Sequence, residues 1–312
     1  MNELELIEHL TRGLPGNESL IRGAGDDCAV LDLKVPGQWV LFKTDAVVEG
    51  IHFTRTDAPE KIGHKALARC LSDIAAMAGT PTAALVTLGL PREFDPDFIK
   101  AIYDGMNALA RRYQVAIAGG ETTTNPERIF ISIALTGVVE REKCLFRAGS
   151  KPGDAIFVSG ELGGSLAGRH LEFEARLAEA RWLAKNFPIH AMIDVSDGLA
   201  SDLRHLLHAG EVGAELLADA IPISRAARKM AQSESSRKPP LLAALTDGED
   251  FELLFTLPAN QAVRLLDDWK AQFPSLRLSC IGKITAEKSL RIRDKTGIKP
   301  LAAHGYVHFQ ES

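Results

Sequence analysis

Acidic residues stand where glycine turns and apolar segments end, and these carboxylates are the side chains best suited to chemistry. In chain order they are Asp26 and Asp27 in GAGDD, Asp45 in FKTDAVVEG, Glu121 in GGETTT, and Asp194 and Asp197 in DVSDG. Each one alone can equally be a turn former or a helix cap. If they converge, cations must offset their repulsion. Lysine or arginine can do this, but Mg²⁺ also bridges carboxylates to substrate phosphates. The pattern therefore indicates a magnesium–nucleotide site.

Asp73 differs from these because it lies inside a segment with helical spacing. The apolar positions of one helix face are Leu67, Leu71, Ile74 and Ala78. The adjacent face is apolar except for Asp73, so this carboxylate is expected to be buried and to need a partner. Arg69, four residues earlier, is the structural alternative to a metal ion.

Three glycine-rich segments support a phosphate-binding interpretation: GAG, the pair at 119–120, and SGELGGS at 159–165. Glycines let the backbone approach phosphates closely, although turn formation explains them equally well. The sequence has no P-loop, no protein-kinase motif set, and neither the GxSxG nor the HExxH motif. Phosphoryl transfer requires positioning and charge neutralisation rather than a protein nucleophile, which suits a site rich in aspartate.

The composition is that of a globular protein, with 312 residues, 46% hydrophobic and 25% charged. The net charge of −5 argues against a nucleic-acid or membrane-surface partner. The four cysteines form no CxxC pair, which favours reduced thiols and a cytoplasmic location. The acidic, amphipathic first residues do not resemble a secretory signal, and no apolar run is long enough to span a membrane.

Strand and helix patterns alternate along both halves of the chain. In the first half we expect a short helix up to residues 13–16, strands within 23–33, 38–53, 82–91, 114–120 and 128–139, and helices over 59–79 and 98–113. In the second half we expect a strand within 150–160, a mostly helical segment over 163–187, a strand at 191–196, a helix over 198–210, a polar loop at 232–240, and strands in 211–218, 250–258, 276–285 and 289–294. Two domains follow, 1–147 and 148–312.

The chain resembles the thiamine-monophosphate kinase family, of the superfamily that includes aminoimidazole ribonucleotide synthetase. The resemblance covers about residues 20–310 through eight ordered segments: GAGDDCAVL, TDAVVEGIHF, HKALARCLSDIAAMAGTP, GGETT, RAGSKPGDAIFVSG, AMIDVSDGLASDL, GEDFELLF and GYVHF. It implies an α/β fold of the α+β type, with two domains and mixed sheets that carry helices on one face. It also implies a homodimer that joins N-terminal sheets, and direct in-line transfer of the γ-phosphoryl group of ATP to thiamine phosphate with several Mg²⁺ ions.

The resemblance further assigns site residues motif by motif, and none acts as a covalent catalyst. The implied metal ligands are Asp27, Thr44, Asp45, Asp73, Glu121, Asp194 and Asp197. The implied ATP contacts are Gly120, Glu121, Arg147 and Ser196, and the implied substrate contacts are His52, Glu249 and Tyr306. Chemistry suits these roles: a guanidinium neutralises phosphate oxygens, and a tyrosine ring stacks on a cationic heterocycle.

Two residues depart from the family pattern. Lys43 stands where a small hydroxyl residue is usual, and it can replace the charge of one cation. Glu121 stands where aspartate is usual, and its longer side chain favours binding Mg²⁺ through water. Asp202 has no matching role and is interpreted as a solvated helix residue. Two alternatives stay open: another ATP-using enzyme of the superfamily, and a catalytically silent nucleotide-binding scaffold.

Overall fold

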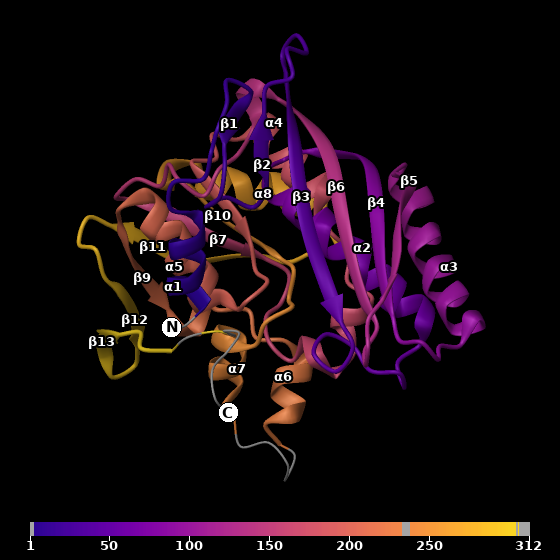
Figure 1. Ribbon diagram of the computed structural model, residues 1–312. Coiled ribbons are helices and arrows are strands. Elements are labelled where there is room, and N and C mark those ends of the chain that lie inside the picture. The colour runs from indigo at the N-terminus through magenta and orange to yellow at the C-terminus, as the bar shows by residue number, and fades with distance from the viewer. Residues whose placement is uncertain (1–2, 233–237, 304, 306–312) are drawn as a thin grey trace.

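The computed structural model describes residues 3–232, 238–303 and 305, and within them the chain forms two mixed β-sheets (Figure 1). The first sheet has six strands in the order β1-β2-β3-β6-β4-β5, and the second has seven in the order β13-β12-β9-β11-β7-β10-β8. Residues 20–140 build the first sheet and residues 154–300 build the second. The boundary at 147 and 148 stays a prediction.

The first sheet is antiparallel except where β4 pairs with β5. Its strands are β1 (Leu20–Arg22), β2 (Ala29–Leu31), β3 (Gln38–Val48), β4 (Thr80–Leu90), β5 (Ala116–Thr124) and β6 (Phe130–Glu140). The helices of this half are α1 (Glu3–Thr11), α2 (Pro59–Ala76) and α3 (Pro96–Tyr113). Proline begins both long helices, where its missing N–H costs nothing.

The two faces of the first sheet differ because side chains alternate along each strand. On β6, Ile133 and Leu135 are buried and belong to the core beneath α2 and α3. The opposite face carries Phe42 and Leu85, whose side chains are 46% and 51% exposed. On β3 the same alternation turns Lys43 toward α2, together with every second residue.

The second half has a sheet that is antiparallel except where β9 pairs with β12. Its strands are β7 (Asp154–Ser159), β8 (Ala191–Asp194), β9 (Gly213–Leu217), β10 (Leu253–Pro258), β11 (Leu278–Thr285), β12 (Leu290–Asp294) and β13 (Gly297–Pro300). Its α-helices are α4 (Leu177–Asn186), α5 (Leu199–Gly210), α6 (Arg225–Met230), α7 (Pro240–Thr246) and α8 (Ala262–Gln272).

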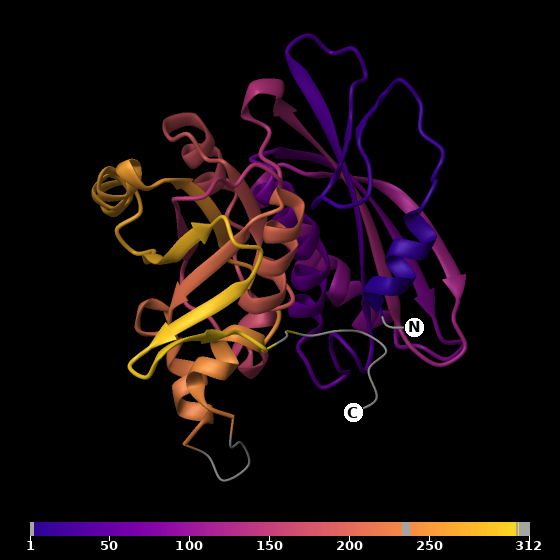
Figure 2. The ribbon, with the colours of Figure 1, turned by 90° about the vertical axis from the view of Figure 1, so that its left-hand side faces the viewer.

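The central strands of the second sheet are covered on both faces. Along β7, Ile156 and Val158 belong to a core with α5, while Ala155 and Phe157 belong to a larger core with α4 and α8. That larger core also includes α2, which lies between the two sheets (Figure 2). The two halves therefore share a hydrophobic core, and α2 can present side chains to both of them.

The expected helix over 163–187 is shorter than predicted, because regular α-helix covers only Leu177–Asn186. Two 3₁₀ turns precede it, at Ser165–Ala167 and Arg169–Leu171, and left-handed glycines at 164 and 168 interrupt any continuous helix. Helices α6, α7 and α8 were not among the expected elements. None of the described helices has both the length and the apolar character needed to cross a membrane.

Candidate active site

Three buried aspartates, which we call the acidic cluster, meet between the two halves. Asp27 precedes β2, Asp73 lies near the end of α2, and Asp194 ends β8. One carboxylate oxygen from each lies within 4.8 Å of those of the others. Residues far apart in sequence therefore converge, which the sequence pattern left open, in an all-oxygen arrangement that suits a hard divalent cation.

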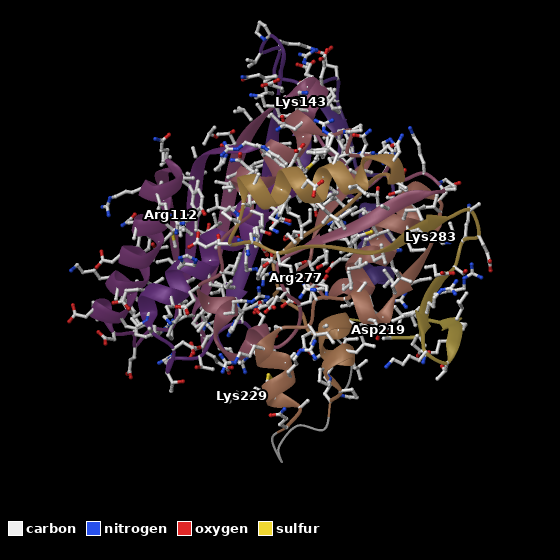
Figure 3. The ribbon with its side chains drawn as sticks, turned by 180° about the vertical axis from the view of Figure 1, so that it is seen from behind. Arg112, Lys143, Asp219, Lys229, Arg277 and Lys283 are labelled. Atoms are coloured by element: carbon white, nitrogen blue, oxygen red, sulfur yellow. The ribbon has the colours of Figure 1, made fainter. Side chains whose placement is uncertain are left out.

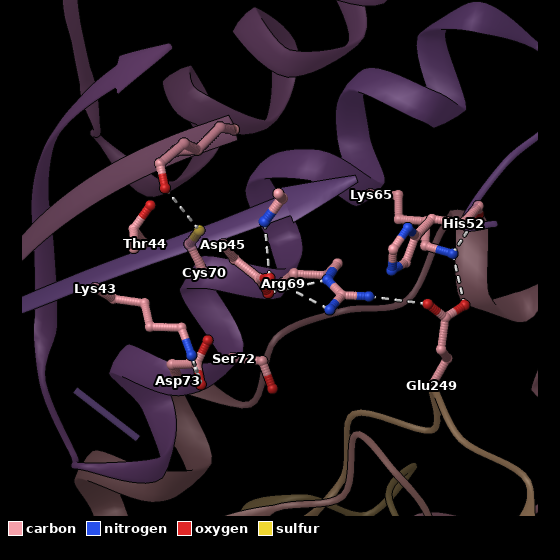
Figure 4. Close-up of polar contacts among 12 residues, drawn as sticks. Lys43, Thr44, Asp45, His52, Lys65, Arg69, Cys70, Ser72, Asp73 and Glu249 are labelled. Carbon is pink, nitrogen blue, oxygen red and sulfur yellow. Dashed lines mark hydrogen bonds and ion pairs between the residues drawn. The ribbon is translucent and has the colours of Figure 1, made fainter. Parts of the chain in front are cut away.

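Each carboxylate of the acidic cluster has a different polar partner. Asp27 Oδ1 accepts a hydrogen bond from Arg147 Nη2 at 2.6 Å. The Nζ atom of Lys43 lies 2.8 Å from Asp73 Oδ1 (Figure 4). Asp194 Oδ2 accepts from the Ser72 hydroxyl at 2.5 Å.

One oxygen of the acidic cluster is left over. Asp27 Oδ2 is buried and has no hydrogen-bond partner among the described residues. Buried carboxylate oxygens are normally satisfied, because desolvation without a partner is costly. This orphaned atom, together with the close oxygens of Asp73 and Asp194, fits a bound Mg²⁺ ion.

The pKa values of Asp194 and Asp73 are raised by their surroundings in the acidic cluster. Burial and the charge of Asp27 raise the pKa of Asp194 to about 6. Burial also raises the pKa of Asp73, and the Lys43 ammonium opposes that rise. Burial and repulsion between neighbouring carboxylates thus both favour the protonated forms of Asp73 and Asp194.

A second ionic group lies beside the acidic cluster and is centred on Arg69 of α2. Arg69 Nε donates to Asp45 Oδ2 at 2.9 Å, and its Nη1 donates to Glu249 Oε1 at 3.0 Å (Figure 4). Lys65, only 1% exposed as a side chain, donates to Glu249 Oε2 at 2.5 Å. Burial would raise the pKa of Glu249, but the hydrogen bond from His170 and the charge of Lys65 outweigh it and lower the pKa to about 2.

A cavity next to these groups brings several of the expected ligand contacts together. Its lining includes Ser196, Asp197, His52, Glu249 and Arg69. Ile51 and Leu166, which are 53% and 62% exposed, add apolar surface to its lining. The larger hollows beside Arg204 and beside Thr80 include none of the expected site residues that the structure describes.

The loop that carries Glu249 has an unusual backbone. Glu249 and Phe251 adopt left-handed conformations with φ of 63° and 51°, which residues other than glycine rarely do. The loop is held because Glu249 N donates to Ser196 O at 2.6 Å, and the Ser165 hydroxyl donates to Glu249 O at 2.6 Å. Such strain persists where surrounding contacts fix it, which is common at functional sites.

His52 is held in its neutral form at the rim of this cavity. Its Nδ1 accepts a hydrogen bond from Val48 N at 3.1 Å. Burial and the charge of Arg69 lower the pKa of His52 to about 4. A neutral imidazole whose Nδ1 accepts a hydrogen bond carries its proton on Nε2.

The structure does not bring every expected residue to the acidic cluster. The Thr44 side chain lies on the opposite face of β3, where its hydroxyl is 3.4 Å from Ser132 Oγ. Gly120 and Glu121 are exposed on β5, the edge strand, with β6 and β4 between it and β3. Tyr306 lies outside the described residues.

Two structural interpretations from the sequence need correction. Arg69 is not the partner of Asp73, because it binds Asp45 and Glu249 while Lys43 takes Asp73. Asp202 is not solvated: it is 2% exposed, and its Oδ2 accepts from Asp197 N at 3.0 Å. Asp202 thus holds the turn that carries Asp197.

The glycines of the 159–165 segment have a packing role. A Cβ on Gly163 would lie 2.7 Å from Ala244 N in α7, and one on Gly164 would lie 2.6 Å from Ala227 N in α6. The expected close approach of backbone is present at these two residues, but the partner is protein.

The interpretation of the sequence missed Lys65, although a signal for it exists. Lys65, Arg69 and Asp73 are spaced by four residues, so they form one charged stripe along an otherwise apolar helix. Ser72 carried no comparable signal, since a serine in a helix is common. Its role depends on Asp194 being opposite it.

Comparison with known proteins places both halves in described families. Residues 25–139 match the N-terminal domain family of AIR synthase related proteins, and residues 151–295 match the corresponding C-terminal domain family. These matches and the two mixed sheets confirm the expected two-domain α/β fold.

Individual relatives are more specific. The thiamine-monophosphate kinase of Rhodopirellula baltica is 40% identical over 314 residues, covering 98% of this chain and 96% of the relative. The enzyme of Bacillus subtilis is 33% identical, covering 99% and 100%. The solved structure of AaThiL complexed with AMPPCP and TMP superposes with a TM-score of 0.83 at 30% identity, covering 99% of this chain and 97% of that one. The protein thus belongs to the thiamine-monophosphate kinase family.

Proposed function

We propose that this protein transfers the γ-phosphoryl group of ATP to thiamine monophosphate, giving thiamine diphosphate and ADP. A terminal phosphate oxygen of the acceptor forms the new P–O bond, while the bond between the γ-phosphorus and the bridging oxygen of ADP breaks. Kinship to thiamine-monophosphate kinases along nearly the whole chain supports this function. So does the likeness to AaThiL, whose complex contains an ATP analogue together with TMP.

The observation that carries the proposal is that the acidic cluster adjoins a cavity lined by Ser196, Asp197, His52 and Glu249. Phosphoryl transfer depends on charge neutralisation and positioning, and this region offers anionic metal ligands beside hydrogen-bonding groups. His52 presents a neutral ring, suited to donating a hydrogen bond to a substrate phosphate.

Mg²⁺ is the cofactor we propose, held by Asp27, Asp73 and Asp194. Bound Mg²⁺ would neutralise the phosphate oxygens between which the phosphoryl group moves. Further Mg²⁺ ions are proposed to bind through residues outside the acidic cluster, namely Thr44, Asp45, Glu121 and Asp197. The proposed nucleotide contacts are Gly120, Glu121, Arg147 and Ser196. His52, Glu249 and Tyr306 are the proposed contacts of thiamine phosphate.

Arg147 and Ser72 orient the acidic cluster in this proposal. Arg147 is bound to Asp27 through Nη2 and Nε, and its backbone N–H donates to Asp26 Oδ1 at 2.9 Å. A guanidinium held in this way can also contact a phosphate through its remaining N–H groups.

We also propose a homodimer formed through the first sheet, and action in the cytoplasm. The exposed Phe42 and Leu85 on the open sheet face support the dimer, since apolar surface of this kind is typical of an interface. The cytoplasmic location rests on the cysteine pattern of the sequence and stays a prediction.

The test is an assay of purified protein with ATP, Mg²⁺ and thiamine monophosphate, in which thiamine diphosphate and ADP are both quantified. Equal amounts of the two products are expected. Omission of thiamine monophosphate is the control for simple ATP hydrolysis. Binding of ATP without thiamine diphosphate formation would contradict the proposal and favour a silent scaffold.

A further inference from the structure

A lysine belongs to the same cluster of charges as the three aspartates. The Lys43 side chain is 24% exposed and that of Asp73 is 10% exposed, so their 2.8 Å contact is largely shielded from water. Figure 4 shows the Lys43 side chain reaching from β3 to Asp73 on α2. This is an internal ion pair in the acidic cluster.

The position of Lys43 is set by the fold. β3 pairs with β6 along its whole length and with β2 on its other side. Its backbone therefore cannot shift independently of the sheet. Alternation turns both Lys43 and Asp45 toward α2, while Thr44 points to the open sheet face. The ammonium therefore reaches Asp73 from a rigid element.

The three aspartates of the acidic cluster differ in how their charges are neutralised. Arg147 neutralises Asp27, Lys43 neutralises Asp73, and Asp194 has a neutral serine hydroxyl. Asp27 Oδ2 stays buried without a hydrogen-bond partner among the described residues. Oxygens of Asp27 and Asp194 are therefore available to bind one divalent ion. One oxygen of Asp73 already contacts Lys43.

We propose that the Lys43 ammonium is a tethered cation that fills one cation position of the acidic cluster, so that the protein binds one divalent ion fewer than its carboxylates would otherwise hold. The inference rests on the proposed metal-assisted function, but it concerns only the number of metal ions that the protein binds. A lysine ammonium is a compact point charge with three donors, and it can replace a cation without needing the octahedral geometry of Mg²⁺.

The experiment counts bound metal in the absence of nucleotide and thiamine phosphate. Free Mn²⁺ is measured by electron paramagnetic resonance during titration of wild-type protein, Lys43→Ser and Lys283→Ser. Lys283 is the matched control, because it is an exposed lysine on strand β11 of the second sheet (Figure 3). Both variants remove one positive charge, but only one changes the acidic cluster.

We expect Lys43→Ser to bind one additional Mn²⁺ ion per chain, and Lys283→Ser to match the wild type. Equal stoichiometry in all three proteins, with dissociation constants within about twofold, would overturn the inference. Lys43→Arg should keep the wild-type stoichiometry, because it retains the charge; a gain of metal in that variant would also count against it.

A measurement on the wild type covers the case in which Lys43→Ser does not fold. Lysine acetylation followed by mass spectrometry reports whether Lys43 stays on Asp73 when Mg²⁺ is added. Slow modification of Lys43 with and without Mg²⁺ is expected. A clear Mg²⁺-dependent increase at Lys43 would show that metal displaces the lysine, and would refute the tethered cation. Because no substrate is present, failure of the kinase assay would leave these results interpretable.

Discussion

Lys65 of α2 contacts Glu249 of the second half through a 2.5 Å ion pair, across 184 residues of sequence. The same ammonium donates to the backbone oxygen of His52 at 2.6 Å and lies 2.8 Å from His170 Nδ1. One buried lysine therefore ties the helix, the β3–α2 loop and the loop of Glu249 together. The same contacts of Lys65 therefore stabilise the folded protein and hold His52 and Glu249 in place at the cavity.

Lys65→Met should destabilise the protein strongly. The substitution leaves the Glu249 charge in a shielded site without one of its cations, which typically costs about 3–5 kcal/mol. Chemical denaturation measures the loss. Lys61→Met is the matched control on the same helix, because Lys61 pairs with Glu172 at the surface and such pairs contribute about 0–1 kcal/mol. Equal losses in the two variants would contradict the role given to Lys65.

Acidification from pH 6.5 to pH 4 should lower stability through His52. Its folded pKa of about 4 lies below the ordinary value of 6.5, so the unfolded chain takes up the proton first in this range. Protonation also removes the acceptor that binds Val48 N. The stabilising contribution is complete above pH 6.5 and is lost as the pH falls toward 4.

Thermal melting at pH 6.5 and at pH 4.5 tests this sign. His52→Asn keeps an acceptor without a titrating ring, so its melting temperature should fall less than that of the wild type between the two pH values. His208→Asn removes an exposed imidazole on α5 and should behave like the wild type. An unchanged pH dependence in His52→Asn would show that other groups cause the loss.

Asp202→Leu should lose more stability than Asp202→Asn. Leucine leaves the Asp197 backbone N–H without its acceptor, at a cost of about 1–3 kcal/mol, while the asparagine carbonyl can still accept. Burial and the charge of Asp197 raise the pKa of Asp202, so a neutral amide is a close mimic of its protonated form. Urea unfolding compares the two, and equal losses would mean that the hydrogen bond to Asp197 contributes little.

Asp45→Asn should reduce turnover at least about a hundredfold if Asp45 holds catalytic metal, which is the scale for losing a main electrostatic stabiliser. The rate of thiamine diphosphate formation at saturating substrates measures the effect. Asp219→Asn, an exposed aspartate in the second half, is the control for the same chemical change (Figure 3). A near-normal rate for folded Asp45→Asn would remove Asp45 from the proposed metal ligands.

The sequence determined the elements of the first half apart from β1, and it named four residues that line the cavity: His52, Ser196, Asp197 and Glu249. Periodicity and proline positions marked α2 and α3 to within a few residues, because helix signals are local. The prediction of secondary structure was less accurate over 163–187, because glycines at 164 and 168 break the helix that the composition suggested. Local chemistry also showed that Asp73 must be buried with a partner.

Only the tertiary structure decided which partner each charge takes. Arg69 lies four residues from Asp73, yet it binds Asp45 at a separation of 24 residues and Glu249 at 180. Lys43 takes Asp73 because β3 presents every second side chain to α2, a relationship set by sheet register and helix packing. Asp202 is buried for a similar reason, since α5 packs against the second sheet. Ion pairs of this kind depend on the distances that packing creates between remote segments, and no local propensity encodes those distances.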